Sequence, residues 1–186
     1  YFITDQDRMI CELSKPYVMI CNRKISSLRE ITGVLESVLR EESSLLVIAD
    51  DVEGDALQGL VLNSMKGVLK VCAIRSPGFG DSRSDMLQDL SVAFGCKVIT
   101  DAERLDQISI EDLGTCKKAL VSRSSTVMIG WEESENLEGR VDSIRKSLEN
   151  PSLDSDQRRV LTTRLSRLSG GVAVMRVGGS TEAELR

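Results

Sequence analysis

Apolar and polar residues follow one another along the chain in patterns that predict short strands and amphipathic helices. Uninterrupted apolar runs of about five residues are typical of strands buried on both faces, whereas apolar residues three and four apart indicate helices. The strands are expected at residues 9–13, 16–21, 45–49, 68–74, 97–100, 119–122, 126–129 and 172–177. The helices are expected at residues 28–39, 55–66, 82–94, 137–148 and 160–168. This mixture, without strict alternation, predicts a layered α/β or α+β fold.

Capping residues mark where the helices begin and end. Ser26 and Asp81 stand where N-caps are expected, and Asp55 opens the second helix. Residues 150–151, Asn-Pro, end the fourth helix, and the short connection after them predicts an antiparallel helical hairpin. The alternating charges of this hairpin are interpreted as its solvated faces. Residues 181–184 have the spacing of a capping box, so a further helix is expected there.

Composition limits the classes of function. A length of 186 residues fits one domain, and a net charge of −5 with a pI near 5.0 argues against a nucleic-acid-binding domain, which normally carries a basic surplus. Histidine is absent, which removes Ser-His-Asp and Cys-His catalysis. No apolar run approaches the roughly 20 residues of a membrane span. The chain starts Tyr-Phe-Ile, without Met or a signal peptide, so we expect a piece of a longer protein.

The cysteines are expected to be buried thiols. Their number is odd and no two form a C-x-x-C pair, so neither a zinc ribbon nor a disulfide framework is indicated. Most stand among aliphatic residues, where cysteine behaves as a small apolar side chain. We therefore expect reduced, mostly inert thiols in a reducing intracellular compartment. The five are Cys11, Cys21, Cys72, Cys96 and Cys116.

The segment Pro-Gly-Phe-Gly-Asp at residues 77–81 lies between a strand and a helix, where a phosphate loop would lie. It lacks the third glycine of the dinucleotide fingerprint and the Gly-Lys-Ser/Thr of a P-loop. Asp81 at the helix entrance would also repel a phosphate. The segment is therefore interpreted as a tight turn.

An acidic cluster follows the buried strand at 45–49. Asp50, Asp51 and Glu53 stand where many α/β enzymes hold Mg²⁺. Acids at the N-terminus of a helix also complement its dipole, and no phosphate loop or catalytic partner accompanies these three. A magnesium-dependent hydrolase using Asp50, Asp51 and Glu53 is kept as an alternative to this capping role.

The helix at 55–66 carries more apolar side chains than docking requires. At about 100° per residue its aliphatic residues spread over roughly 200° of the helical wheel, whereas a surface helix needs a stripe of about 100°. The helix is either buried on most sides or exposes aliphatic side chains deliberately. An exposed apolar strip rimmed by polar groups is typical of a surface that binds another chain.

Five segments in register resemble the apical domain of a group I (GroEL-type) chaperonin. They are ADDVEGDAL at 49–57, VLKV at 68–71, PGFGD at 77–81, MLQD at 86–89 and LSGGVAV at 168–174, and the resemblance covers essentially the whole chain. It implies a three-layer β/β/α swivelling domain at residues 1–169. Residues 170–186 would then be the hinge and the start of the returning intermediate-domain segment. ATP and Mg²⁺ would bind to an equatorial domain outside this chain, so this fragment itself is expected to be no enzyme and to hold no cofactor or metal.

The resemblance also implies partners and a binding surface. In the family, two helices face the cavity of a homo-oligomeric ring, and their groove binds non-native polypeptides or the mobile loop of a GroES-type co-chaperonin. Thr32 stands where the family usually has leucine, which predicts a weaker hydrophobic grip there. Glu53 and Glu182 match residues of the family's intersubunit contacts. The matching groove positions are Tyr1, Phe2, Thr32, Leu35, Leu57, Val61, Leu62 and Asn63.

The resemblance implies that the isolated fragment is a monomer. The acidic net charge and the lack of a long apolar run predict that it binds neither nucleic acid nor membranes. The expected location is the bacterial cytoplasm or the lumen of an organelle, either the mitochondrial matrix or a plastid. A second hypothesis within the same family is that the chain belongs to a degenerate chaperonin paralogue with a scaffolding role and little client binding. Thr32, which stands where the family usually has leucine, is the residue that favours this second hypothesis.

Overall fold

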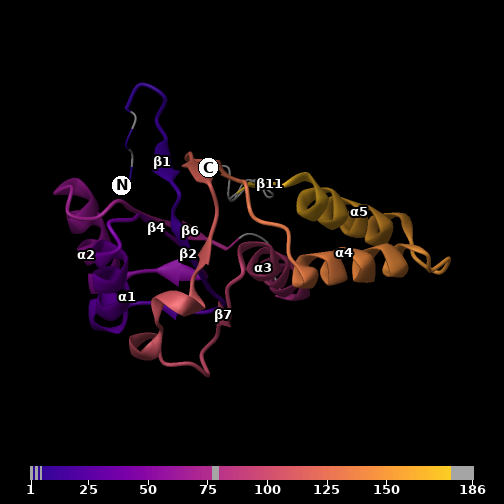
Figure 1. The fold of residues 1–186 in the computed structure, drawn as a ribbon, viewed down its shortest axis with the longest axis horizontal. Helices are drawn as coiled ribbons and strands as arrows, with labels where there is room; N and C mark the ends of the chain where they lie inside the picture. The colour runs from indigo at the N-terminus through magenta and orange to yellow at the C-terminus, as the bar shows by residue number, and fades with distance from the viewer. Residues whose placement is uncertain (1, 3, 5, 77–79, 177–186) are drawn as a thin grey trace.

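The structure, a computed structural model, describes residues 2, 4, 6–76 and 80–176 (Figure 1). The turn expected at 77–80 lies outside the described residues except for Gly80, and the helix expected at 181–184 lies wholly outside them. In the described part of the chain, each helix is too short or too polar to cross a bilayer. The helices are α1 (Leu28–Arg40), α2 (Gly54–Met65), α3 (Gly80–Phe94), α4 (Glu135–Leu148), α5 (Ser155–Gly170) and two 3-10 turns, Leu105–Gln107 and Ile110–Asp112. The strands are β1 (Cys11–Ser14), β2 (Tyr17–Cys21), β3 (Lys24–Ile25), β4 (Leu45–Ala49), β5 (Asp51–Val52), β6 (Val71–Arg75), β7 (Val98–Ile99), β8 (Gly114–Thr115), β9 (Lys118–Val121), β10 (Ser125–Ile129) and β11 (Val172–Arg176).

A parallel sheet in the order β6-β4-β2-β7 forms the centre of the fold, and β8 pairs antiparallel with β2. The chain runs from β2 to β4 to β6 in one direction and then returns to β7 on the other side of β2. Because crossovers between parallel strands are right-handed, α1 and α2 lie on one face of this sheet and α3 lies on the other (Figure 1). All five residues of β4 are buried, as a strand covered on both faces requires.

A second, antiparallel sheet has the order β1-β9-β10-β11. Leu13, Ala119, Met128 and Ala173 lie opposite one another across its four strands, and all are fully buried. The hairpin expected near 119–129 is confirmed as β9 and β10. Gly171 takes the left-handed conformation that ends α5, and β11 follows directly. The domain boundary at 169/170 stays a prediction.

The mixed α/β architecture predicted from the pattern is confirmed, with local differences. No strand was expected in the acidic segment after β4, but Asp51–Val52 forms β5 and pairs with Lys24–Ile25 of β3. Two-residue strands are too short to leave a pattern in a sequence. The strand expected from residue 68 begins at 71, which leaves Val68 exposed at the end of α2.

The caps of α1 and α2 also differ from the expectation. Ser27, not Ser26, occupies the N-cap of α1, and its side chain makes no capping hydrogen bond. Instead, the Leu28 N–H donates to Asp55 Oδ1 at 3.2 Å. Asp55 therefore lies inside the first turn of its own helix and caps the neighbouring one. Asp81 likewise lies inside the first turn of α3 rather than at its N-cap.

Helices α4 and α5 form the predicted hairpin, which packs beside α3 (Figure 1). A buried carboxylate of α3, that of Asp89, holds the hairpin there. Arg140 Nε donates to Asp89 Oδ1 at 2.8 Å. Arg164 donates through Nε to Oδ2 at 2.7 Å and through Nη2 to Oδ1 at 2.9 Å. The hydrogen bond with Asp89 raises the pKa of Arg164. The interpretation of the hairpin charges as solvated was wrong for these two arginines, because a fully buried Asp89 needs cationic partners.

Candidate functional site

Helices α1 and α2 contact each other where Gly59 of α2 faces Leu28 in the first turn of α1. An added Cβ on Gly59 would lie 2.5 Å from Leu28 Cδ1, so the absence of a side chain at Gly59 is what lets α2 come this near. The Ala56 N–H also donates to the Ser26 carbonyl at 3.4 Å, beside the capping bond from Asp55. The beginnings of the two helices are thus joined by packing and by two hydrogen bonds.

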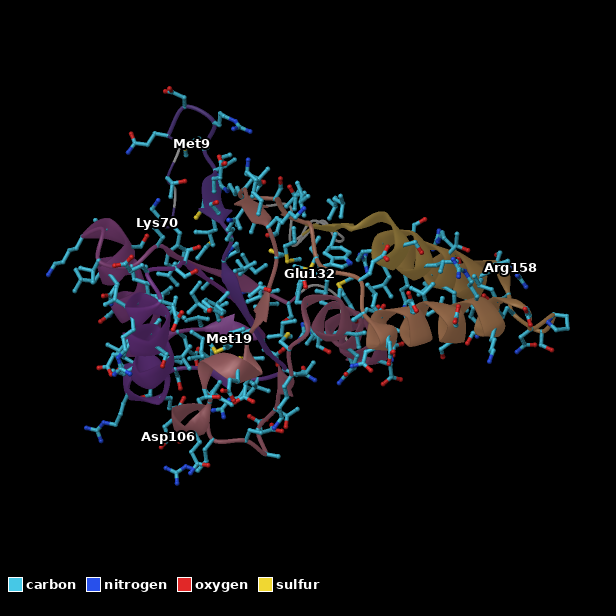
Figure 2. The ribbon with its side chains drawn as sticks, viewed as in Figure 1. Met9, Met19, Lys70, Asp106, Glu132 and Arg158 are labelled. Atoms are coloured by element: carbon cyan, nitrogen blue, oxygen red, sulfur yellow. The ribbon has the colours of Figure 1, made fainter. Side chains whose placement is uncertain are left out.

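The far end of α2 exposes three aliphatic side chains, Leu62, Met65 and Val68, here called the α2 strip. Their exposed fractions are 52%, 76% and 49%. Leu62 and Met65 stand three residues apart on α2 and are neighbours on its surface, and Val68 follows the helix just after Gly67. Figure 2 labels Lys70, which lies on the segment that leads from α2 into β6 and gives this end of the molecule a polar edge.

Asn63 has a structural part in ending α2. Its side-chain Nδ2 donates to the Gly59 carbonyl at 2.7 Å. Its own carbonyl accepts from the N–H groups of Val68 and Leu69 at 3.1 and 3.4 Å, while Gly67 turns the chain with a φ of 68°. These bonds fix the backbone that presents the α2 strip.

The expected groove residues on the two helices differ in exposure. On α1, Thr32 is exposed and its hydroxyl donates to the Leu28 carbonyl at 2.8 Å, whereas Leu35 is only 9% exposed. On α2, Leu57 and Val61 are half-buried and pack against the core. Leu62 is therefore the best exposed aliphatic residue of the expected set.

The remaining expected positions lie elsewhere or are not described. Phe2 is buried and lines a cleft whose other walls come from β1, β6 and the β9–β10 hairpin. Glu53 occupies the N-cap of α2 and is exposed, as a contact with a neighbouring subunit would need. Tyr1 and Glu182 lie outside the described residues.

The acidic cluster is engaged by other residues of the chain. Asp50 Oδ1 accepts from Arg83 Nη1 at 2.8 Å, and Asp51 Oδ1 accepts from Arg75 Nε at 3.3 Å. Asp55 caps α1. Within residues 2, 4, 6–76 and 80–176, no three acidic or cysteine side chains are placed to hold a metal ion. The alternative of a magnesium-dependent hydrolase therefore has no site geometry to support it.

Burial of the cysteines is confirmed for four of the five, and Cys96 is partly exposed. Burial raises the pKa of Cys21 and of Cys96 to about 12, and that of Cys116 to about 11. These three thiols are therefore protonated at neutral pH and poorly nucleophilic. The sequence did not indicate that Cys11 and Cys72 lie together, because the two residues come from different sheets.

The fold is that of a chaperonin domain. The crystal structure of the chaperonin gp146 from the bacteriophage EL 2 (Pseudomonas aeruginosa), solved in the presence of ATP-BeFx, matches 94% of this chain with a TM-score of 0.59. The match covers 36% of the phage chain at 19% sequence identity, and at that identity it shows the fold alone.

The chain is homologous to chaperonin GroEL. It is 40% identical over 190 residues to the GroEL of Neorickettsia risticii and 41% identical to that of Neorickettsia sennetsu. Both alignments include the whole chain, which spans about a third (34%) of the length of these relatives. No family model matches the chain. The resemblance seen in the five segments is thus confirmed at the level of the family, and the homology supports a chaperonin-family role.

Proposed function

We propose that this chain is the apical domain of a GroEL-type chaperonin and binds non-native polypeptides through the exposed apolar surface of α1 and α2. The observation that carries the proposal is the α2 strip, with three large aliphatic side chains about half exposed or more in a chain homologous to GroEL. Removing apolar surface from water is favourable by about 25 cal/mol of free energy for each Å² buried. An extended or helical segment with aliphatic anchors is the occupant that this surface fits.

The partners follow from the same proposal. A GroES-type co-chaperonin loop would compete with clients for this surface, and several copies of the domain would stand in a homo-oligomeric ring. Glu53 would meet the neighbouring subunit from the N-cap of α2, and Glu182 would contribute to the same contacts. The isolated fragment is expected to be monomeric and without ATPase activity, because ATP and Mg²⁺ would bind to another part of the protein. The proposed location is a reducing compartment, either the bacterial cytoplasm or an organelle lumen, which suits five free thiols.

Binding by a single domain is expected to be weak. The strip is small, and association costs several kcal/mol in lost translational and rotational freedom before any gain appears. A ring that presents several strips to one flexible client converts later contacts into intramolecular ones and so gains avidity. Peptide affinity should therefore rise steeply when the domain is displayed in several copies on one scaffold.

The test compares two serine substitutions at equally exposed aliphatic positions. Leu62→Ser removes the aliphatic side chain that is best exposed among the expected groove residues. The matched control is Val160→Ser, because Val160 lies on α5 and has an exposed fraction of 49%. Fluorescence anisotropy with a labelled amphipathic peptide carrying leucine anchors measures the affinity. Leu62→Ser should weaken binding several-fold and Val160→Ser should leave it unchanged, while urea unfolding changes little for either.

Thr32→Leu supplies the opposite perturbation. It adds an exposed aliphatic side chain to α1 and removes only a hydroxyl bonded to its own helix, so peptide binding should tighten. If the wild type, Leu62→Ser and Thr32→Leu all bind the peptide equally poorly, client binding is lost and the scaffolding paralogue is the better description. If Leu62→Ser and Val160→Ser weaken binding equally, the peptide binds elsewhere on the molecule.

A further inference from the structure

Cys11 and Cys72 meet where the two sheets of the fold come together. Cys11 lies on β1, the edge strand of the antiparallel sheet, and Cys72 lies on β6, the edge strand of the parallel sheet. Both side chains line the same cleft, and each shifts the pKa of the other. Each residue is only 2% exposed, so the pair is held in place by packing on both sides.

A cleft of about 710 Å³ leads to this pair of thiols, and both cysteines belong to its lining. Phe2 and Met9 contribute apolar wall, and Arg75 and Arg123 contribute positive charge. A cleft of this volume is far larger than a hydrogen peroxide molecule, which occupies about as much space as one or two waters. The thiols are therefore buried from bulk solvent but reachable by a small oxidant.

The two sulfurs are unequal. The interaction with Cys72 lowers the pKa of Cys11, and the interaction with Cys11 raises the pKa of Cys72 well above its usual value. Of the two sulfurs, Cys11 is thus the one that ionises more readily. A thiolate is the nucleophilic form of cysteine, and sensor cysteines typically stand beside a second, resolving thiol.

We propose that Cys11 and Cys72 form an oxidative modification site, in which a hydroperoxide entering the cleft converts the two thiols into a disulfide between β1 and β6. The Cys11 thiolate attacks a peroxide oxygen, the O–O bond breaks, and protonation of the leaving hydroxide gives water and a sulfenic acid at Cys11. The Cys72 sulfur then attacks the sulfenic sulfur, the S–O bond breaks, and a second water leaves. In sum, two thiols and one hydrogen peroxide give one disulfide and two waters.

The disulfide would link two edge strands that no backbone ladder joins. Each of β1 and β6 is the terminal strand of its own sheet, and within the described residues β1 pairs with β9 and β6 pairs with β4. A bond between Cys11 and Cys72 would therefore fix the two sheets against each other at the cleft. This inference stands on the cysteine geometry and is independent of the proposed client binding.

The experiment treats the folded chain with hydrogen peroxide and maps the product by mass spectrometry without reduction. We expect an intact mass lower by two hydrogen atoms, a Cys11–Cys72 cross-linked peptide, and a fall in titratable thiols from five to three after denaturation. The reagent dithiothreitol should restore all five. Cys21 and Cys96 are the internal control, because burial raises the pKa of both thiols to about 12 and should leave them unreacted.

Variants separate the two roles. Cys72→Ser should leave a sulfenic acid at Cys11 that a dimedone probe labels, Cys11→Ser should leave Cys72 unlabelled, and Cys116→Ser should form the cross-link as the wild type does. Circular dichroism checks that each variant is folded. The proposal is overturned if the folded wild type keeps five free thiols, if another pair of cysteines is linked, or if the Cys11–Cys72 link appears only in denaturant. The mass-spectrometric map of cross-linked peptides from the oxidised wild type distinguishes these outcomes even if a variant fails to fold.

Discussion

Replacing Asp89 by asparagine should cost this domain a large part of its stability. Asp89 is fully buried and accepts three hydrogen bonds, of 2.7, 2.8 and 2.9 Å, from Arg140 and Arg164. Asparagine has nearly the same shape but no charge. Its amide NH₂ group, which can only donate, would face N–H donors of the arginines in place of a carboxylate oxygen. The two guanidinium groups would also lose the negative charge that they share.

The magnitude follows from those contacts. Removing one partner of a buried ion pair typically costs about 3–5 kcal/mol, because the remaining charge is left without compensation. Two features moderate the loss here. The asparagine oxygen still accepts from one or both arginines, and Arg164 keeps a second carboxylate, Asp85, at 3.8 Å. The expected loss is therefore at the lower end, about 3 kcal/mol, or roughly 6–12 °C in Tm for a chain of this size.

Urea unfolding followed by circular dichroism measures this loss. Asp142→Asn is the matched control, since Asp142 is exposed and pairs at 3.5 Å with Arg145 on its own helix, where the change should stay within about 0.5 kcal/mol. Hydrogen exchange gives a second readout, because α4 and α5 should lose protection in Asp89→Asn before the parallel sheet does. A loss below about 1 kcal/mol for Asp89→Asn would refute the reasoning that this carboxylate holds the hairpin on α3.

Three further predictions concern a carboxylate and two glycines. Hydrogen bonds from the Thr100 hydroxyl and backbone N–H lower the pKa of Glu103 to about 2. The contribution of the Glu103 carboxylate to stability should therefore be present above about pH 4.5 and be lost as the pH falls toward 2. In pH-dependent urea unfolding, the stability advantage of the wild type over Glu103→Gln should shrink over that range. Gly33→Ala should stabilise α1 by about 0.5–1 kcal/mol, because nothing lies within 4 Å of an added Cβ in this helix interior. Gly114→Ala should instead destabilise by about 1–3 kcal/mol, since its Cβ would lie 2.6 Å from Phe94 Cβ and 2.8 Å from the Phe94 carbonyl oxygen; equal unfolding midpoints for the two variants would contradict both glycine predictions.

The sequence predicted the elements that carry a strong local pattern. The five apolar residues of Leu45–Ala49 identified a strand covered on both faces, and the surplus of aliphatic residues on α2 indicated the exposed strip. Residue-by-residue resemblance identified the family, but it did not predict which groove residues are exposed. Leu35 is buried and Leu62 is exposed because the two residues pack differently against the rest of the fold.

Features made by tertiary contacts were missed. The pairing of Cys11 with Cys72 joins two sheets and leaves no local trace in the sequence. Asp89 did leave a signal: at about 100° per residue it lies only about 40° from Ala93 on the α3 wheel, inside the apolar arc. An acid in that position predicts a buried cationic partner, but which arginines pair with it, Arg140 and Arg164, is decided by how α4 and α5 pack on α3.

The bond from the Leu28 N–H to the Asp55 carboxylate has a mechanical consequence for the two helices of the candidate surface. Because the first turn of α1 is capped by a side chain of α2, sliding or rotating one helix against the other would break this hydrogen bond. Thermal opening of one first turn therefore promotes opening of the other, so the two form one cooperative unit. Any reorientation of this part of the molecule would carry Thr32, Leu35 and Leu62 together, with their spacing preserved.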